Sequence, residues 1–180
     1  MKHAYTYTYT IHGPFIIKKS KEGLVSRNKD VKRNFWNKIR KTEESLPSAC
    51  GCYLFAIRAG KGTKPCYVGL TGKQTFEHEC FASQKLNIYN EALGRKKGTP
   101  VLFLLAKRTS KGKFVKPSKN KHPSSNFLET FLIGVVIDKN PKLMNTQKTK
   151  YLREMCVPQL INTPRKKPTR PESEFKKAIE

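Results

Sequence analysis

Residues 50–70 read CGCYLFAIRAGKGTKPCYVGL, and this stretch decides the fold. Its first part, 50–59, is rich in apolar residues and predicts a strand, and 66–70 predicts a second strand. The glycine- and lysine-rich residues 60–65 lie between them. We therefore expect an antiparallel hairpin with a loop of moderate length.

Two further strands are expected outside the hairpin. Residues 101–106 are a continuous apolar run, which is typical of a central buried strand. Residues 5–11 alternate tyrosine and threonine, which favours a half-exposed edge strand, although tyrosines at this spacing could also stack on bases. Helices are predicted over 30–44, 75–81, 86–93 and from residue 126 onward. The fold class is α/β (α+β), with a small, mainly antiparallel central sheet flanked by helices.

The chain divides into three parts by composition. Residues 1–48 form an N-terminal extension with one strand and a basic helix, which packs on the core, lies along a phosphate backbone, or does both. Residues 49–162 form the core, interrupted by a lysine- and proline-rich loop at 109–125 that we expect to be mobile. Residues 163–180 form a basic, proline-rich tail.

The charge of the chain points to a polyanionic partner. Lys and Arg total 37 against 13 Asp and Glu, so the formal net charge is +24. A phosphate backbone releases counterions on binding such a surface, so nucleic acid, DNA in particular, is the expected partner. A basic protein that only coats nucleic acid has the same charge. The expected binding residues are Lys73, Lys96, Lys97, Lys107, Arg108, Lys111 and Lys113.

The sequence also bounds the compartment. It contains no apolar run of about 18 residues and no signal-peptide pattern, so we expect a cytoplasmic, intracellular protein without a membrane partner. Five cysteines are an odd number, which indicates reduced thiols. Zinc is disfavoured because no CxxC or HxxxH pair accompanies them.

Glu129 stands out in the helix that follows residue 126. At 100° per residue, Thr130, Gly134 and Asp138 share the polar side, whereas Glu129 lies in line with the apolar Ile133. A carboxylate on an apolar face is costly unless a cation or hydrogen bonds compensate it. Glu129 therefore either binds a metal ion or pairs with one of the many basic side chains.

Taken together, these residues resemble the GIY-YIG nuclease family. Gly51-Cys52-Tyr53 stands at the first half of the family name and Tyr67-Val68-Gly69 at the second. Glu129 resembles the helix glutamate of the family, and residues 141–145, PKLMN, resemble its downstream proline–leucine–asparagine end. The match spans about residues 50–145, in the family's order and spacing.

The resemblance implies a metal-dependent endonuclease that hydrolyses phosphodiester bonds in DNA, of a restriction, repair or mobile-element type. Tyr67 would be the general base and Tyr53 would orient water or phosphate, with Gly51 and Gly69 as structural residues. Glu129 would hold Mg²⁺ or Mn²⁺. Asn145 would tie the helix end to the active-site strand. A second such pattern, PQLIN at 158–162, competes for that last assignment.

One departure from the family concerns its arginine. The family carries it on the helix after the second tyrosine, where Glu79 stands in this chain. Lys85 is the first candidate to replace it, followed by Arg95, with Lys73 also near the hairpin, although each has the alternative role of an ordinary solvated charge. His78 is a candidate base or ligand. Loss of the arginine also favours the alternative function, a non-catalytic nucleic-acid-binding protein on a degenerate nuclease fold.

Overall fold

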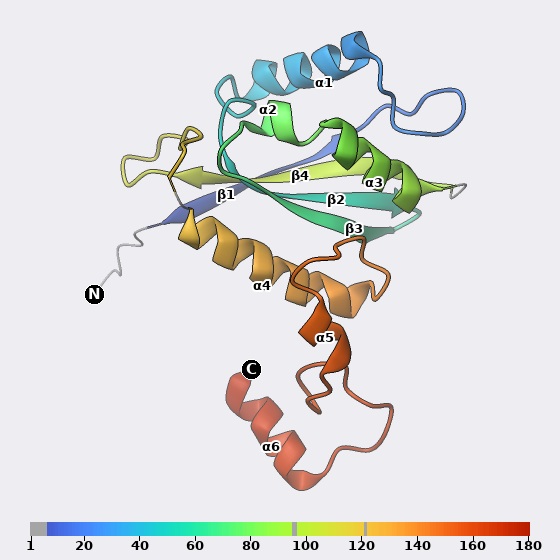
Figure 1. Ribbon diagram of the computed structural model, residues 1–180. Coiled ribbons are helices and arrows are strands. Elements are labelled where there is room, and N and C mark those ends of the chain that lie inside the picture. The colour runs from blue at the N-terminus through green and yellow to red at the C-terminus, as the bar shows by residue number, and fades with distance from the viewer. Residues whose placement is uncertain (1–6, 95–96, 121) are drawn as a thin grey trace.

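A four-stranded antiparallel sheet forms the centre of the computed structural model, which describes residues 7–94, 97–120 and 122–180 (Figure 1). The strands are β1 (Thr8–Ile16), β2 (Gly51–Ala59), β3 (Gly62–Thr71) and β4 (Thr99–Arg108). Their order is β1-β4-β2-β3, so β4 and β2 are central and β1 and β3 are the edges. The expected fold class is confirmed, and β1 belongs to the same sheet as the core.

The β2–β3 hairpin is tighter than the sequence predicted. Ala59 pairs with Gly62, so only Gly60 and Lys61 form the turn. Gly60 has a positive φ of 55°, which suits glycine in a two-residue hairpin turn. β3 therefore begins four residues earlier than expected. It accommodates Pro65 because β3 is an edge strand and its register shifts at that point.

Three helices cover one face of the sheet: α1 (Lys29–Thr42), α2 (Phe76–Glu79) and α3 (Ser83–Leu93) (Figure 1). The side chain of Asn28 caps α1 by accepting hydrogen bonds from the backbone at its first turn. Trp36 from α1 and Tyr89 from α3 are buried against the sheet, and the Tyr89 ring stacks on Phe55 with centroids 4.1 Å apart. Such a stacked pair contributes about 1 kcal/mol beyond burial itself.

Helix α4 (Pro123–Lys139) covers the opposite face of the sheet (Figure 1). Its buried Ile133, Val136 and Ile137 pack with Val68 of β3 in a second, smaller core. Glu129 lies on this packed side, as the helical spacing predicted, and its side chain is 15% exposed. None of the described helices is both long and apolar enough for a membrane span.

The loop before α4 is attached to the sheet, contrary to the prediction that little of it could pack. Val115 donates a backbone hydrogen bond to Lys107 and accepts one from Cys50, and the Ser118 amide donates to Gly72. Phe114 packs against the main core. The composition of the loop did not predict these attachments, because they are backbone hydrogen bonds and the packing of one aromatic side chain, Phe114.

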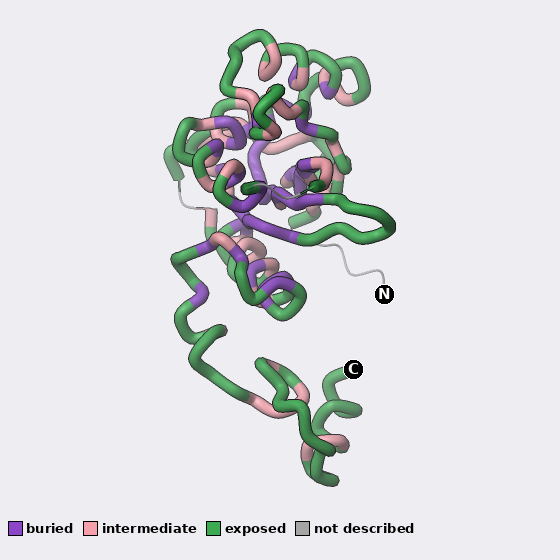
Figure 2. The backbone as a smooth tube through the Cα atoms, turned by 90° about the vertical axis from the view of Figure 1, so that its right-hand side faces the viewer, coloured by how far each residue is buried: buried purple, intermediate pink, exposed green. Residues whose placement is uncertain are grey.

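The C-terminal region contains two helices that the sequence analysis did not predict: α5 (Lys150–Glu154), at the end of the predicted core, and α6 (Arg170–Ile179), in the predicted tail. α6 has a capping box, in which Thr169 and Glu172 bond each other's backbone amides. Neither helix has a buried residue. Figure 2 shows this region as a mostly exposed extension beyond α4.

Candidate functional site

The two glycines of the hairpin motif are required by close packing. A Cβ at Gly69 would lie 2.1 Å from the Cζ of Tyr53, so the Tyr53 ring sits directly on this backbone. A Cβ at Gly51 would lie 2.1 Å from the carbonyl oxygen of Leu105 on β4. The motif glycines therefore let β2 and its neighbours hold the first tyrosine in place.

Tyr53 is sealed inside the core. It is 0% exposed, and its ring lies 6.2 Å from that of Tyr67. Its hydroxyl makes no good hydrogen bond to the described residues, and burial raises its pKa well above the usual value. In this arrangement the Tyr53 hydroxyl is not exposed to water or phosphate. The role of Tyr53 that the structure shows is the packing of its ring against Gly69 on the neighbouring strand.

Tyr67 instead reaches a charged cluster at the β3 edge. The ammonium of Lys85, on α3, donates a 2.9 Å hydrogen bond to the Tyr67 hydroxyl oxygen. Lys85 also pairs with the carboxylate of Glu79 at 3.4 Å, and its side chain is only 19% exposed. Glu79, which stands where the GIY-YIG resemblance leads one to expect an arginine, therefore pairs with the cation that contacts Tyr67.

The electrostatics of this cluster keep Lys85 charged. Burial lowers the pKa of Lys85, but the hydrogen bond and charge interaction with Tyr67, together with Glu79, outweigh it and leave the pKa above the usual value. The charged ammonium of Lys85 therefore lies within hydrogen-bond reach of the Tyr67 hydroxyl oxygen.

A groove of about 640 Å³ adjoins the cluster and connects the two layers of the fold. Glu79 lines it from the α2 side, Leu70 and Lys73 from β3 and the following turn, and His122 and Asn126 from the start of α4. Lys73 is exposed there. Glu79 is thus the residue of the charged cluster that lines the groove, and Asn126 lines it from the helix that carries Glu129.

Glu129 lies one helical turn beyond Asn126, on the face of the sheet opposite Tyr67. Its carboxylate accepts a 2.6 Å hydrogen bond from Lys148, so the ion-pair alternative is the arrangement in this structure. Lys148 has a positive φ of 63°, an uncommon conformation for a residue with a side chain. The pKa of the nearby Cys52 thiol is raised to about 12, chiefly by burial and in smaller part by the negative charge of Glu129.

Asn145 clamps the edge strand. Its side-chain amide accepts a hydrogen bond from the Val68 amide at 2.9 Å and donates one to the Val68 carbonyl at 2.8 Å. These are bonds of the kind that the resemblance implies, and they occupy backbone groups on an edge strand that would otherwise need another partner. Asn162, of the competing pattern, instead donates to the carbonyls of Leu152 and Met155 at the end of α5.

The other candidates lie apart from the cluster or outside the described residues. His78 is exposed on α2, where its backbone amide bonds the capping Thr75. Arg95 and Lys96 fall outside the described residues. Lys107 is bonded to Ser124 at 2.8 Å, and the Arg108 guanidinium covers the Phe114 ring at 3.6 Å. Lys97, Lys111 and Lys113 are exposed.

Sequence reasoning missed two residues of the site. Lys148 was not considered because it follows Glu129 by 19 residues and lies in an irregular loop without periodicity. His122 packs its ring over Gly72 and lines the groove, and its only sequence signal is a histidine next to the helix-starting Pro123. Within the described residues, no three His, Cys, Asp or Glu side chains gather as a metal cluster.

Comparisons with protein-family models, curated proteins and solved structures gave no match to this chain.

Proposed function

We propose that this protein is a metal-dependent endonuclease of the GIY-YIG type that hydrolyses phosphodiester bonds in DNA. The observation that carries the proposal is the Lys85–Tyr67 hydrogen bond of 2.9 Å, placed beside a groove at the end of the motif hairpin. A net charge of +24 supports a nucleic-acid substrate. The motif order and the Asn145 clamp support the nuclease type.

In the proposed reaction, Tyr67 removes the proton from the attacking water. A free tyrosine, with an ordinary pKa of about 10, is too weakly ionised for this work near neutral pH. Lys85 compensates by stabilising the phenolate, and Glu79 holds Lys85 in position. We therefore assign Lys85 to activation of Tyr67, and the exposed Lys73 of the groove to the phosphate.

Tyr53 and Asn145 are positioning residues in this scheme. The buried Tyr53 ring fills the space above Gly69, and Asn145 fixes the backbone of Val68, next to Tyr67. Both restrain the strand that carries the base. A proton transfer depends steeply on such positioning, because the phenolate must lie within hydrogen-bond reach of the water.

The residues fit a single-carboxylate metal site. Glu129 is partly exposed, and the chemistry of Mg²⁺ and Mn²⁺ suits one carboxylate completed by water and substrate phosphate. When bound, the ion would supply Lewis-acid stabilisation of the developing negative charge. Glu129 would hold the ion, and Lys148, its present partner, would have to move from the carboxylate oxygen.

One observation favours the alternative of a non-catalytic nucleic-acid-binding protein. The only acid on the packed side of α4 already has a cation, Lys148, at 2.6 Å. A permanent ion pair there would leave the fold able to bind DNA but without a metal. Incubation of supercoiled plasmid with purified protein and Mg²⁺ distinguishes a nuclease from a binding protein. A nuclease converts the plasmid to nicked or linear DNA, and EDTA prevents this conversion. A binding protein only shifts the plasmid on a gel.

A further inference from the structure

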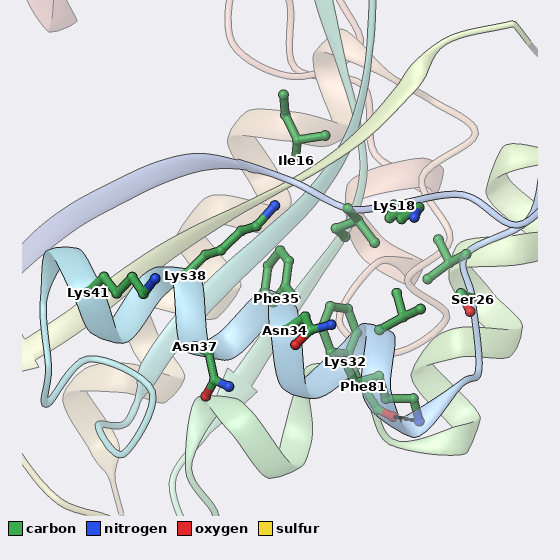
Figure 3. Close-up of a pocket in the computed structure, with 13 residues that line it drawn as sticks. Ile16, Lys18, Ser26, Lys32, Asn34, Phe35, Asn37, Lys38, Lys41 and Phe81 are labelled. Carbon is green, nitrogen blue, oxygen red and sulfur yellow. Dashed lines mark hydrogen bonds between the residues drawn. The ribbon is translucent and has the colours of Figure 1, made fainter.

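A second groove, of about 440 Å³, lies between α1 and the end of β1 (Figure 3). β1 and β3 are opposite edges of the sheet, so this groove is separate from the tyrosine cluster. Figure 3 shows Phe35 and Lys38 extending from α1 toward the end of β1 at Ile16 and the segment with Lys18 that follows it. We call it the α1 groove.

The charged residues of the α1 groove are all basic. Lys18, Lys32, Lys38 and Lys41 line it, and none of the 13 described residues that line it is acidic. Lys18, Lys38 and Lys41 are exposed, and no ion pair is found for them among the described residues. Unpaired lysines converging on one groove favour a ligand with several negative charges.

The floor of the groove is apolar and aromatic. Phe35 is half-buried and packs edge-on against Trp36 and Phe81, with centroids 5.1 and 5.0 Å apart. Ile16, at the groove margin, is 58% exposed. An aromatic floor inside a ring of cations matches the chemistry of single-stranded nucleic acid, whose bases stack on aromatic rings while its phosphates contact lysines.

We propose that the α1 groove binds a single-stranded segment of nucleic acid, with a base on Phe35 and phosphates on Lys18, Lys38 and Lys41. A paired duplex cannot fit this role, because its bases are stacked and do not reach an apolar floor. That the ligand is a nucleic acid rests on the proposed function. The α1 groove would add a preference for DNA with unpaired ends or branches.

The groove also lies close to the proposed active site along the chain. Glu79 lines the site groove and Phe81, two residues later, lines the α1 groove. Two residues span at most about 7 Å of backbone. The short segment from Glu79 to Phe81 therefore joins the site groove to the α1 groove.

Trp36 offers a local readout, because it is the only tryptophan and its ring lies against Phe35 and Phe81. Oligodeoxythymidine should quench Trp36 emission on titration into wild-type protein without metal, and a hairpin duplex without overhangs should not. Equal quenching by both would overturn the proposal. So would a response to anionic phosphatidylglycerol vesicles without one to oligodeoxythymidine, since the groove would then bind lipid.

Charge reversal tests the lysines. Lys38→Glu with Lys41→Glu should weaken oligodeoxythymidine binding by about tenfold or more and reduce the log–log salt slope by about 1.4, at about 0.7 for each single-strand phosphate contact. The matched control is Lys139→Glu with Lys142→Glu, two exposed lysines near the far end of α4 with the same change of charge. Equal weakening in both variants would contradict a specific groove.

The outcomes separate this inference from the nuclease proposal. Plasmid cleavage that depends on Tyr67, with oligodeoxythymidine binding unaffected by the α1 charge reversal, overturns the α1 groove and leaves the nuclease. Binding that depends on Lys38 and Lys41, in a protein that never cleaves, leaves the groove and removes the nuclease.

Discussion

The Nζ of Lys85 lies 2.9 Å from the hydroxyl oxygen of Tyr67, and the two residues come from different elements, α3 and β3. Eighteen residues separate them in the sequence. The ammonium is also within 5.2 Å of the Tyr67 ring centre. This relationship gives the second motif tyrosine a cationic partner, which supports the proposed role of Tyr67 as the general base.

Replacement of Lys85 should reduce the rate of cleavage far more than DNA affinity. Lys85→Met removes the cation but keeps an unbranched side chain, and we expect a loss of about a hundredfold at neutral pH. Single-turnover rates and DNA affinity measure this, with the exposed hairpin residue Lys61→Met as the control. A wild-type cleavage rate in Lys85→Met would rule out activation of Tyr67 by Lys85.

Removal of Lys148 should make metal binding easier. In the present structure its ammonium occupies a carboxylate oxygen of Glu129, so the ion and the lysine compete. Lys148→Met should lower the Mg²⁺ concentration needed for half-maximal cleavage and tighten Mn²⁺ binding measured by electron paramagnetic resonance. Glu129→Gln should remove both responses. Weaker Mn²⁺ binding in Lys148→Met would show that the lysine supports the metal site instead.

A methyl group at Gly69 should destabilise the hairpin. The added Cβ would come within 2.1 Å of the Tyr53 ring, which is fully buried and cannot move without disturbing the core. We expect Gly69→Ala to lower the free energy of unfolding by about 3 kcal/mol. Gly134→Ala on α4 is the control, since its nearest atoms lie 3.9 Å away and alanine favours helix. Urea unfolding of both variants gives the comparison, and equal stabilities would show that the Tyr53 ring does not rest on Gly69.

Loss of the Asn145 amide should loosen the edge strand. Asn145→Asp keeps the size and the acceptor for the Val68 amide but places a carboxylate oxygen against the Val68 carbonyl. We expect a loss of about 2 kcal/mol, from one bond replaced by a repulsive contact. Asn162→Asp, in the similar sequence pattern, should cost less, because the exposed Asn162 side chain bonds only the end of α5 and not the sheet. Hydrogen exchange at the Val68 amide reports the effect directly, and protection unchanged by Asn145→Asp would remove Asn145 as the clamp.

The sequence predicted the parts of the site that depend on local patterns. The hairpin, the inward position of Glu129 and the central strand at 101–106 follow from periodicity. The partner of Glu129 could not be predicted, because Lys148 reaches it from an irregular loop with a positive φ. The attachment of Val115 to the sheet is a backbone contact, and side-chain composition carries no signal for it.

The most direct test is the single-turnover cleavage of plasmid DNA by Tyr67→Phe, measured together with DNA affinity. The substitution removes one hydroxyl and its hydrogen bond to Lys85, so the fold should persist with a loss of about 1 kcal/mol. We predict a Mg²⁺-dependent wild-type rate that falls by about a hundredfold or more in Tyr67→Phe, with affinity nearly unchanged. Cleavage by Tyr67→Phe at the wild-type rate, or a wild-type protein that binds plasmid and never cuts it, would contradict the account.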